Sequence, residues 1–179
     1  VHPTLLPIGK GPWPWPYLIL KDIEESGVTI HKISERYDSG DILMQRKFPI
    51  PTNSSVELVT HRSHILAAEM IQECLKSFEQ FWLCAKRQSE PGEWWGMPTI
   101  KDRTIRTTMD LHQIIRVVNA FGHYGSFLFL NGQLIHIKKA TGWESDNAIE
   151  PSQVIYRSVN EIVVTVKGGY LCIADYQIV

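Results

Sequence analysis

The sequence contains no apolar run that approaches the roughly 18 to 20 residues needed to cross a bilayer. It also lacks the basic and then apolar opening of a secretory signal. These two absences argue against a membrane protein and against an exported one. We therefore expect a cytoplasmic protein that has no membrane partner.

Cysteine is scarce, since Cys74, Cys84 and Cys172 are the only three in the chain and their spacing shows no pairs. Disulfide frameworks and structural zinc sites need cysteines or histidines in close, regular pairs. His61 and His64 stand three positions apart but have no third ligand within reach. We expect the cysteines to be small buried side chains in a reducing compartment, and we expect no metal site.

An excess of charge of either sign is also lacking, because 18 Lys and Arg against 19 Asp and Glu leave a net charge of -1. A broad nucleic-acid footprint needs clustered positive charge, so this balance argues against one. With 44% apolar and 21% charged residues, the 179 residues suit one large or two small globular domains. The chain opens with Val within an apparent motif, so we expect it to be the later part of a longer protein.

Proline, by contrast, is abundant at the beginning of the chain. Each proline fixes φ and removes a backbone donor, so no regular helix is expected before the last of this group. Gly9 and Gly11 flank Lys10 and permit close backbone approach to a neighbour or a ligand. The five prolines are Pro3, Pro7, Pro12, Pro14 and Pro16.

Two titratable residues, His2 and Asp38, stand at the ends of this opening stretch, beside residues that force a tight backbone. Titratable side chains on loops at strand ends are typical of a proton-transfer pair. The interpretation depends on the fold bringing them together. Trp13 and Trp15 lie between them, either as core plugs or as walls of a pocket for a planar ligand.

The sequence pattern of the first half of the chain predicts an α/β arrangement. A short helix is expected over residues 17–21, and β-branched residues favour a strand over 28–33. A second strand over 42–50 follows the turn residues 37–41, so a hairpin or a strand-loop-strand unit is expected.

A long amphipathic helix is predicted next. Ser54 and Glu57 form the pattern of a capping box, with Ser54 as the N-cap. Apolar residues then recur at spacings of three and four up to about Cys84, which is typical of a helix that covers a sheet face. Residues 87–98 lose this periodicity and contain Pro91, Gly92, Gly96 and Pro98, so we interpret them as a linker.

The second half predicts one helix and about five short antiparallel strands. The helix is expected over 108–121, and Gly122 ends it. Asn131-Gly132 is a strong hairpin signal between strands 126–130 and 133–140. Three further strands are expected over 154–157, 161–167 and 170–178, and the whole set suits a small barrel or a strongly curled sheet.

Four motifs carry a resemblance to a known family. They are His2-Pro3-Thr4-Leu5-Leu6-Pro7, Gly9-Lys10-Gly11-Pro12, Gly27-Val28-Thr29-Ile30-His31 and Tyr37-Asp38-Ser39-Gly40-Asp41-Ile42-Leu43. Their order, and the 36 positions between His2 and Asp38 (38 − 2), resemble the folate-dependent formyltransferase family. That family has an Asn-x-His-Pro-Ser-Leu-Leu-Pro segment, a Gly-rich loop, a Gly-Val-Thr strand and a Leu-Asp-Thr-Gly-Asp loop. Thr4 stands where the family has Ser, and the family Asn would precede Val1.

The second half resembles the C-terminal domain of the methionyl-tRNA and amino-sugar branches of that family. Residues 116–127 resemble its start, and residues 165–171 with Tyr176-Gln177 resemble its closing strands. The glycinamide ribonucleotide branch lacks this domain and ranks lower. The resemblance therefore implies the C-terminal part of a doubly wound α/β catalytic domain (1–86), a linker (87–98) and an OB-like antiparallel β-barrel domain (99–179).

The resemblance also implies chemistry and site residues. A substrate amine would attack the formyl carbon of 10-formyltetrahydrofolate, with His2 as acid/base and Asp38 as its partner. We expect activity in the full-length form and none in this chain alone. The implied folate contacts are Thr4, Leu5, Leu6, Pro7, Ser39 and Gly40, and the implied acceptor contacts are Lys10, Trp13 and Tyr37.

The acceptor amine is the least determined point. Residues 91–179 carry eight Lys and Arg and eight Asp and Glu, a net charge of zero, whereas a tRNA enzyme should present a basic face. We therefore expect a nucleotide-linked amino sugar first and methionyl-tRNA second. An amino group on a carrier-bound aminoacyl chain, a homodimer, and a non-catalytic binding or assembly module remain open.

Overall fold

The computed structural model describes residues 1–88, 91–146 and 150–179. The chain divides into two compact units, Val1–Met97 and Pro98–Val179. Residues 87–97, which the sequence predicts as part of a linker, therefore belong to the first unit. Each unit is described by itself below.

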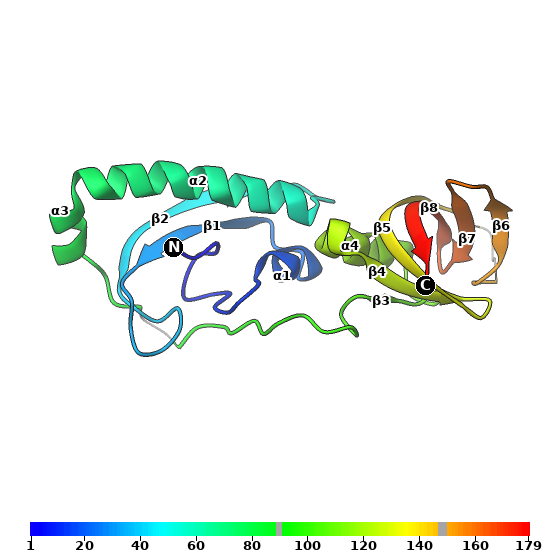
Figure 1. Cartoon of the computed structure of the whole chain (residues 1–179), viewed down its shortest axis with the longest axis horizontal. Coiled ribbons are helices and arrows are strands. Elements are labelled where there is room, and N and C mark those ends of the chain that lie inside the picture. Colours follow the sequence, from blue (N-terminus) through cyan, green and yellow to red (C-terminus); the bar gives the residue numbers. More distant parts are fainter. Residues whose placement is uncertain (89–90, 147–149) are drawn as a thin grey trace. The chain divides into compact units, whose positions relative to one another are not determined.

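The first unit is built on a two-stranded antiparallel sheet of β1 (Glu25–His31) and β2 (Ile42–Pro49), as Figure 1 shows. The predicted strand over 28–33 is thus displaced toward the N-terminus, because Glu25 pairs with Pro49 at the far end of the hairpin. Among the described residues this unit has no parallel sheet, so the doubly wound arrangement remains a prediction.

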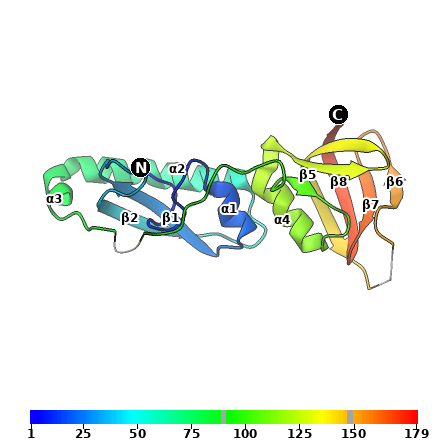
Figure 2. The same cartoon turned by 90° about the horizontal axis from the view of Figure 1, so that it is seen from below.

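Three helices complete the first unit. The short helix α1 (Trp15–Leu20) begins one residue before Pro16, because a proline is tolerated in the first turn, where its missing N–H would have no helical acceptor. The long helix α2 (Val56–Lys76) lies along the hairpin in both views (Figures 1 and 2). The third, α3 (Phe78–Leu83), follows it directly.

The predicted helix over 54–84 is wrong at its start and in its length. The N-cap is Ser55, whose side chain accepts a hydrogen bond from the Leu58 N–H, while the Ser54 hydroxyl donates to the Pro51 carbonyl. Ser77 leaves the helical region, at φ -137° and ψ 40°, and so separates α2 from α3. The predicted apolar stripe is split accordingly: Met70 is buried, whereas Leu75 and other residues toward α3 are exposed.

The end of the first unit folds back over its beginning. Lys86 and Ile42 exchange backbone hydrogen bonds, at 2.9 and 2.7 Å. Farther along, the Lys10 N–H donates to the Glu93 carbonyl and the Trp95 N–H donates to the Lys10 carbonyl, at 3.0 and 2.7 Å. Lys86, Glu93 and Trp95 therefore make backbone hydrogen bonds to earlier residues of the same unit, although the sequence around them shows no periodicity.

Within its described residues the second unit contains one α-helix, α4 (Leu111–Phe121). It begins later than predicted because Asp110 is its extended N-cap residue. Gly122 ends it, as predicted, and starts a 3₁₀ turn (Gly122–Tyr124). The apolar face of α4 is deeply buried, with Ile114 and Phe121 fully covered. This helix therefore supplies much of the unit's core.

A six-stranded sheet forms the rest of the second unit, in the order β3-β4-β5-β8-β7-β6 (Figures 1 and 2). The predicted hairpin at Asn131-Gly132 is confirmed, with both residues at positive φ, as a two-residue turn of this kind requires. Its strands are β4 (Ser126–Leu130) and β5 (Gln133–Glu144). The three C-terminal strands are β6 (Val154–Arg157), β7 (Ile162–Val166) and β8 (Gly169–Ile178).

One strand was not predicted. The short β3 (Thr104–Ile105) pairs with β4 in parallel, whereas every other ladder of this sheet is antiparallel. In the part of the chain that the structure describes, no pairing joins the end strands β3 and β6. Closure of the sheet into a barrel therefore remains a prediction.

The remaining expectations concern membranes and cysteines. None of the helices in the described ranges is both long and apolar enough to traverse a membrane. All three cysteines are free thiols, but only Cys74 is buried. Cys84 is exposed, contrary to the prediction, because it follows the short helix α3, which buries none of its own residues.

Candidate functional site

The backbone of His2 is held beside the first strand. Its N–H and carbonyl exchange hydrogen bonds with the carbonyl and N–H of Thr29, at 2.8 and 2.9 Å. The Thr29 hydroxyl extends this attachment, because it donates to the Thr4 carbonyl and accepts from the Leu6 N–H. The Gln45 side chain donates to the Leu6 carbonyl. The loop that carries His2 is thereby fixed on the hairpin.

Asp38 lies in the turn between the two strands, at a φ of 53°. Aspartate is among the few residue types that adopt this left-handed conformation readily. One carboxylate oxygen, Oδ2, accepts a hydrogen bond from the Gly11 N–H at 2.9 Å. Only glycine fits there, since a Cβ on Gly11 would lie 2.0 Å from the Trp95 carbonyl oxygen. Gln88 steadies the turn by donating to the Asp38 and Gly40 carbonyls.

The fold brings His2 and Asp38 together. His2 Nδ1 lies 3.5 Å from Asp38 Oδ1. The other ring nitrogen, Nε2, lies 2.8 Å from the Gly9 carbonyl, which can only accept, so Nε2 carries the proton of the neutral ring. Nδ1 is then the nitrogen that can take up a proton and share it with the carboxylate.

A third titratable residue, His31, also faces this carboxylate. Its Nε2 lies 3.8 Å from Asp38 Oδ1, and its Nδ1 lies 2.9 Å from the Lys32 carbonyl. The sequence predicts a strand position for His31 and assigns it no role in the site. Its position at the end of β1, next to the turn that carries Asp38, is the sequence feature that could have placed His31 in the site.

Burial determines the charge state of both histidines. His2 is only 5% exposed, and burial lowers its pKa from 6.5, although the Gly9 hydrogen bond and the charge of Asp38 both raise it. Burial likewise lowers the pKa of His31, against the opposing effects of the Lys32 carbonyl and Asp38. Both rings are therefore mainly neutral at pH 7.

Lys10 and Ser39 are also brought together. The Lys10 ammonium donates to the Ser39 hydroxyl at 3.2 Å, although Lys10 is only 6% exposed. Both residues line a polar pocket of about 580 Å³. Lys10 is therefore close to the turn that carries Asp38.

The other predicted contacts differ in accessibility. Thr4 is buried and its hydroxyl donates to the Ile8 carbonyl at 2.7 Å, so it shapes the loop. Leu6 is buried as well, whereas Leu5 and Pro7 are half-buried. Tyr37 is 85% exposed. Gly40 lies against Lys32, where a Cβ would approach the Lys32 carbonyl oxygen to 1.8 Å.

The two tryptophans of the opening loop lie differently. The Trp15 indole donates to the Ser63 hydroxyl at 3.2 Å and meets the His64 ring edge-on, so it docks α1 on α2. Trp13 is half-buried in the loop before α1. Its predicted role in acceptor binding is neither supported nor contradicted by this placement.

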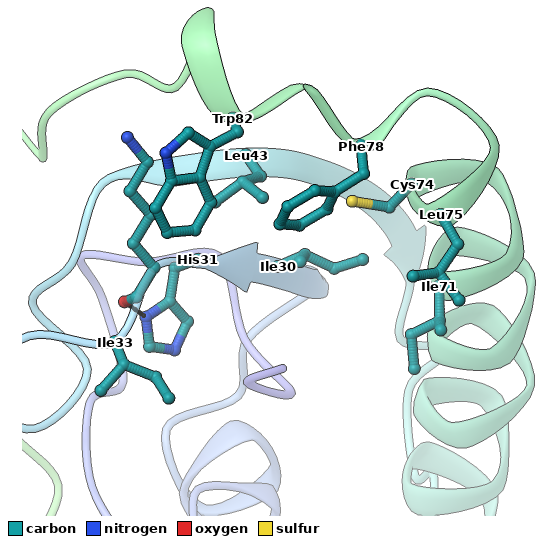
Figure 3. Close-up of a pocket in the computed structure, with 10 residues that line it drawn as sticks. Ile30, His31, Ile33, Leu43, Ile71, Cys74, Leu75, Phe78 and Trp82 are labelled. Atoms are coloured by element: carbon teal, nitrogen blue, oxygen red, sulfur yellow. Dashed lines mark hydrogen bonds between the residues drawn. The ribbon is translucent and has the colours of Figure 1, made fainter. Parts of the chain in front are cut away.

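His31 also lines an apolar pocket of about 350 Å³ (Figure 3). Ile30 and His31 of β1 line it together with Phe78 and Trp82 from the α3 region. The Lys32 ammonium lies over the Trp82 ring, 4.5 Å from its centroid. His31 therefore lines this apolar pocket and also lies close to the carboxylate of Asp38.

Within the ranges 1–88, 91–146 and 150–179, no group of three or more His, Cys, Asp or Glu side chains is placed to hold a metal ion. The site is a carboxylate faced by the buried imidazole of His2 and the half-buried imidazole of His31. Such a group can accept, hold and return a proton.

Comparison with known proteins matches both units. Residues 1–75 match a family described as formyl transferase, and residues 99–178 match the formyl transferase C-terminal domain. A methionyl-tRNA formyltransferase from Syntrophus aciditrophicus is 27% identical over 179 residues, covering 99% of this chain and 57% of that protein. The chain thus spans somewhat more than half the length of this curated relative.

Solved structures share the fold. HypX from Aquifex aeolicus in complex with tetrahydrofolic acid superposes with a TM-score of 0.82 at 23% identity, over 98% of this chain and 31% of that one. An N-formyltransferase from Helicobacter canadensis, in complex with folinic acid and dTDP-3-aminofucose, gives 0.72 at 19% identity, over 98% and 65%. Since the two family matches together cover most of both units, the chain belongs to the formyltransferase family.

Proposed function

We propose that the protein transfers a formyl group from 10-formyltetrahydrofolate to a primary amine, with His2 and Asp38 as its proton-transfer pair. The observation that carries the proposal is the placement of Asp38 Oδ1 3.5 Å from the Nδ1 of a buried, neutral histidine. Membership of the formyltransferase family supports the reaction class.

The reaction asks for this kind of pair. The amine nitrogen forms a bond to the formyl carbon, and the bond from that carbon to N10 of the folate breaks. One proton must leave the amine, and one must reach N10. His2 takes the first proton at Nδ1, where the carboxylate of Asp38 stabilises the imidazolium, and the pair returns a proton to the leaving nitrogen.

For the acceptor, we propose methionyl-tRNA. The sequence ranks a nucleotide-linked amino sugar first, but the similarity to a methionyl-tRNA formyltransferase along both units supports the tRNA acceptor better. In this proposal the second unit completes an OB-like barrel and contacts the tRNA, and the folate lies against residues 4–7, Ser39 and Gly40.

An amino sugar on a nucleotide is the second candidate. The zero net charge of residues 91–179 favours a small acceptor, since a tRNA-binding face should be basic. The fold shared with the Helicobacter canadensis enzyme is compatible with this alternative.

Formyl transfer should be assayed with the native gene product, including any residues that precede Val1, with both acceptors offered in parallel. We expect formylation of methionyl-tRNA and a binding constant for the tRNA that weakens steeply as salt rises. Formylation of the amino-sugar nucleotide alone would select the second candidate. Transfer to neither acceptor would overturn the proposal and favour a non-catalytic binding module.

A further inference from the structure

We propose that the polar pocket beside the Asp38 turn binds an oxyanion carried by one of the two substrates. Its lining residues are Lys10, Arg36, Ser39, Asp41, Arg87, Gln88 and Pro91. The inference rests on the proposed function for the source of the oxyanion, either a phosphate of the acceptor or a carboxylate of the folate donor. The binding of an oxyanion itself is argued from the pocket alone.

The strongest observation is that Lys10, a residue only 6% exposed, has no counter-charge beside its ammonium in the described part of the chain. Among the described residues, no carboxylate oxygen lies within 4.0 Å of Lys10 Nζ, and its hydrogen bond goes to the neutral Ser39 hydroxyl. Burying a charged group is unfavourable unless it is paired with the opposite charge. A bound oxyanion would supply the missing negative charge and a charge-assisted hydrogen bond.

The backbone explains why Lys10 stays in this place. Hydrogen bonds to Glu93 and from Trp95 hold the Lys10 peptide on both sides, at 3.0 and 2.7 Å. Gly9 and Gly11 have positive φ values of 73° and 126°, which most residues avoid. The chain therefore holds Lys10 in a fixed, buried position, although lysine is usually exposed.

The charged side chains at the rim of the pocket are also mainly positive. Arg36 and Arg87 are exposed side chains that line it, and Asp41 is the one acidic residue among the lining set. Three cations and one carboxylate leave a formal charge of +2 (3 − 1). Asp41 is itself shared with Lys32, whose ammonium lies 3.8 Å away. Arginine forks and a lysine together are well suited to phosphate or carboxylate oxygens.

The pocket adjoins the proposed catalytic pair. Ser39 follows Asp38 directly, and the Gly11 N–H next to Lys10 donates to the Asp38 carboxylate. Gln88, another lining residue, donates to the Asp38 carbonyl at 3.0 Å. An anion held here would fix its substrate close to the reacting atoms, which converts binding energy into correct orientation.

The first experiment measures pyrophosphate binding to the chain by calorimetry at constant ionic strength. We expect Lys10→Met to weaken binding about 10- to 100-fold, because the buried charge-assisted contact is lost. Lys101→Met, a matched substitution at an exposed lysine of the second unit, should leave it unchanged. If Lys10→Met does not fold, the double variant Arg36→Gln/Arg87→Gln, at exposed positions, should weaken binding about 10-fold.

A second experiment identifies the source of the oxyanion. If 5-formyltetrahydrofolate displaces pyrophosphate and 5-formyltetrahydropteroate, which lacks the glutamate, does not, the pocket receives the carboxylates of the donor. If neither displaces it, the pocket serves the phosphate of the acceptor. Absence of pyrophosphate binding, or binding equal in wild type and the lysine and arginine variants, would overturn the inference. None of these measurements requires turnover, so a failure of oxyanion binding is distinguishable from a failure of formyl transfer.

Discussion

The two units bury different kinds of side chain. The second unit buries three polar residues among those described, and all three carry hydroxyl groups that need no counter-charge. The first unit buries seven, and two of them, His2 and Lys10, can carry a charge. The seven are His2, Thr4, Lys10, Ser26, Thr29, Ser54 and Ser63, against Thr107, Ser126 and Thr165 in the second unit.

This difference in buried side chains corresponds to a difference in how each unit is held together. The second unit combines α4 with a six-stranded sheet over an apolar core, an arrangement that apolar periodicity alone can stabilise. The first unit instead holds its loops through hydrogen bonds to buried polar groups, such as the Thr29 hydroxyl. Each such group must keep its partners, so the loops are fixed firmly enough to orient titratable side chains.

The largest expected effect is on the rate of formyl transfer, through the proposed proton-transfer pair of the first unit. Asp38→Ala should lower kcat/KM for formyl transfer by about 10²- to 10⁴-fold, because His2 loses the group that stabilises its protonated form. The measurement is steady-state formyl transfer by the native gene product. Glu35→Gln, an exposed acid of the same turn, is the matched control and should retain wild-type kinetics. A rate near wild type for Asp38→Ala would refute the catalytic assignment.

The next effect tests whether the second unit is held by its apolar core. Phe121 is fully buried, and Phe121→Ala should lower the free energy of unfolding of that unit by about 3–5 kcal/mol. Denaturant unfolding followed by circular dichroism measures this change. Phe129→Ala, at an exposed position of β4, should change it by less than about 1 kcal/mol. Equal effects of the two substitutions would contradict the comparison.

The pH dependence of stability distinguishes the units in a different way. Burial lowers the pKa of His2 in the folded protein below the value of 6.5 expected in the unfolded chain. Between these two pKa values the unfolded chain therefore binds more protons than the folded protein. Stability should therefore increase with pH up to about pH 6.5 and then level off, with a slope of at most about 1.4 kcal/mol per pH unit for one group.

His2→Asn should flatten that slope in part, and the remainder should come from His31, whose pKa burial also lowers. Urea unfolding between pH 5 and 7.5 measures both contributions. An unchanged slope in His2→Asn would show that the buried ring is not the group that titrates.

The smallest effect concerns the helix that packs on the hairpin. Ser55→Ala should destabilise the first unit by about 0.5–1 kcal/mol, because the Leu58 N–H loses its cap. Ser55→Asp should restore stability, since aspartate caps as well and favours the helix N-terminus. Thermal unfolding compares the three proteins. A larger loss in Ser54→Ala alone would revive the cap that the sequence predicts.

Much of the local structure could be predicted from the sequence, because it depends on backbone preferences that single residues carry. Asn131-Gly132 adopts the positive φ values of a tight hairpin, and Gly122 ends α4. The motifs around His2 and Asp38 also identified the family, which the two matches bear out. Less could be predicted where neighbouring residues compete for one role, as Ser54 and Ser55 do for the helix cap.

The sequence by itself determined the family and the main helices and strands, and it singled out His2 and Asp38 as a candidate pair. Only the tertiary structure decided that they meet, that His31 faces the same carboxylate, and that Lys10 is buried without a counter-charge. The physical reason is distance along the chain. Periodicity and turn chemistry act over a few residues, whereas His2, Gln88 and Trp95 reach the Asp38 turn and its neighbours through long-range hydrogen bonds and packing.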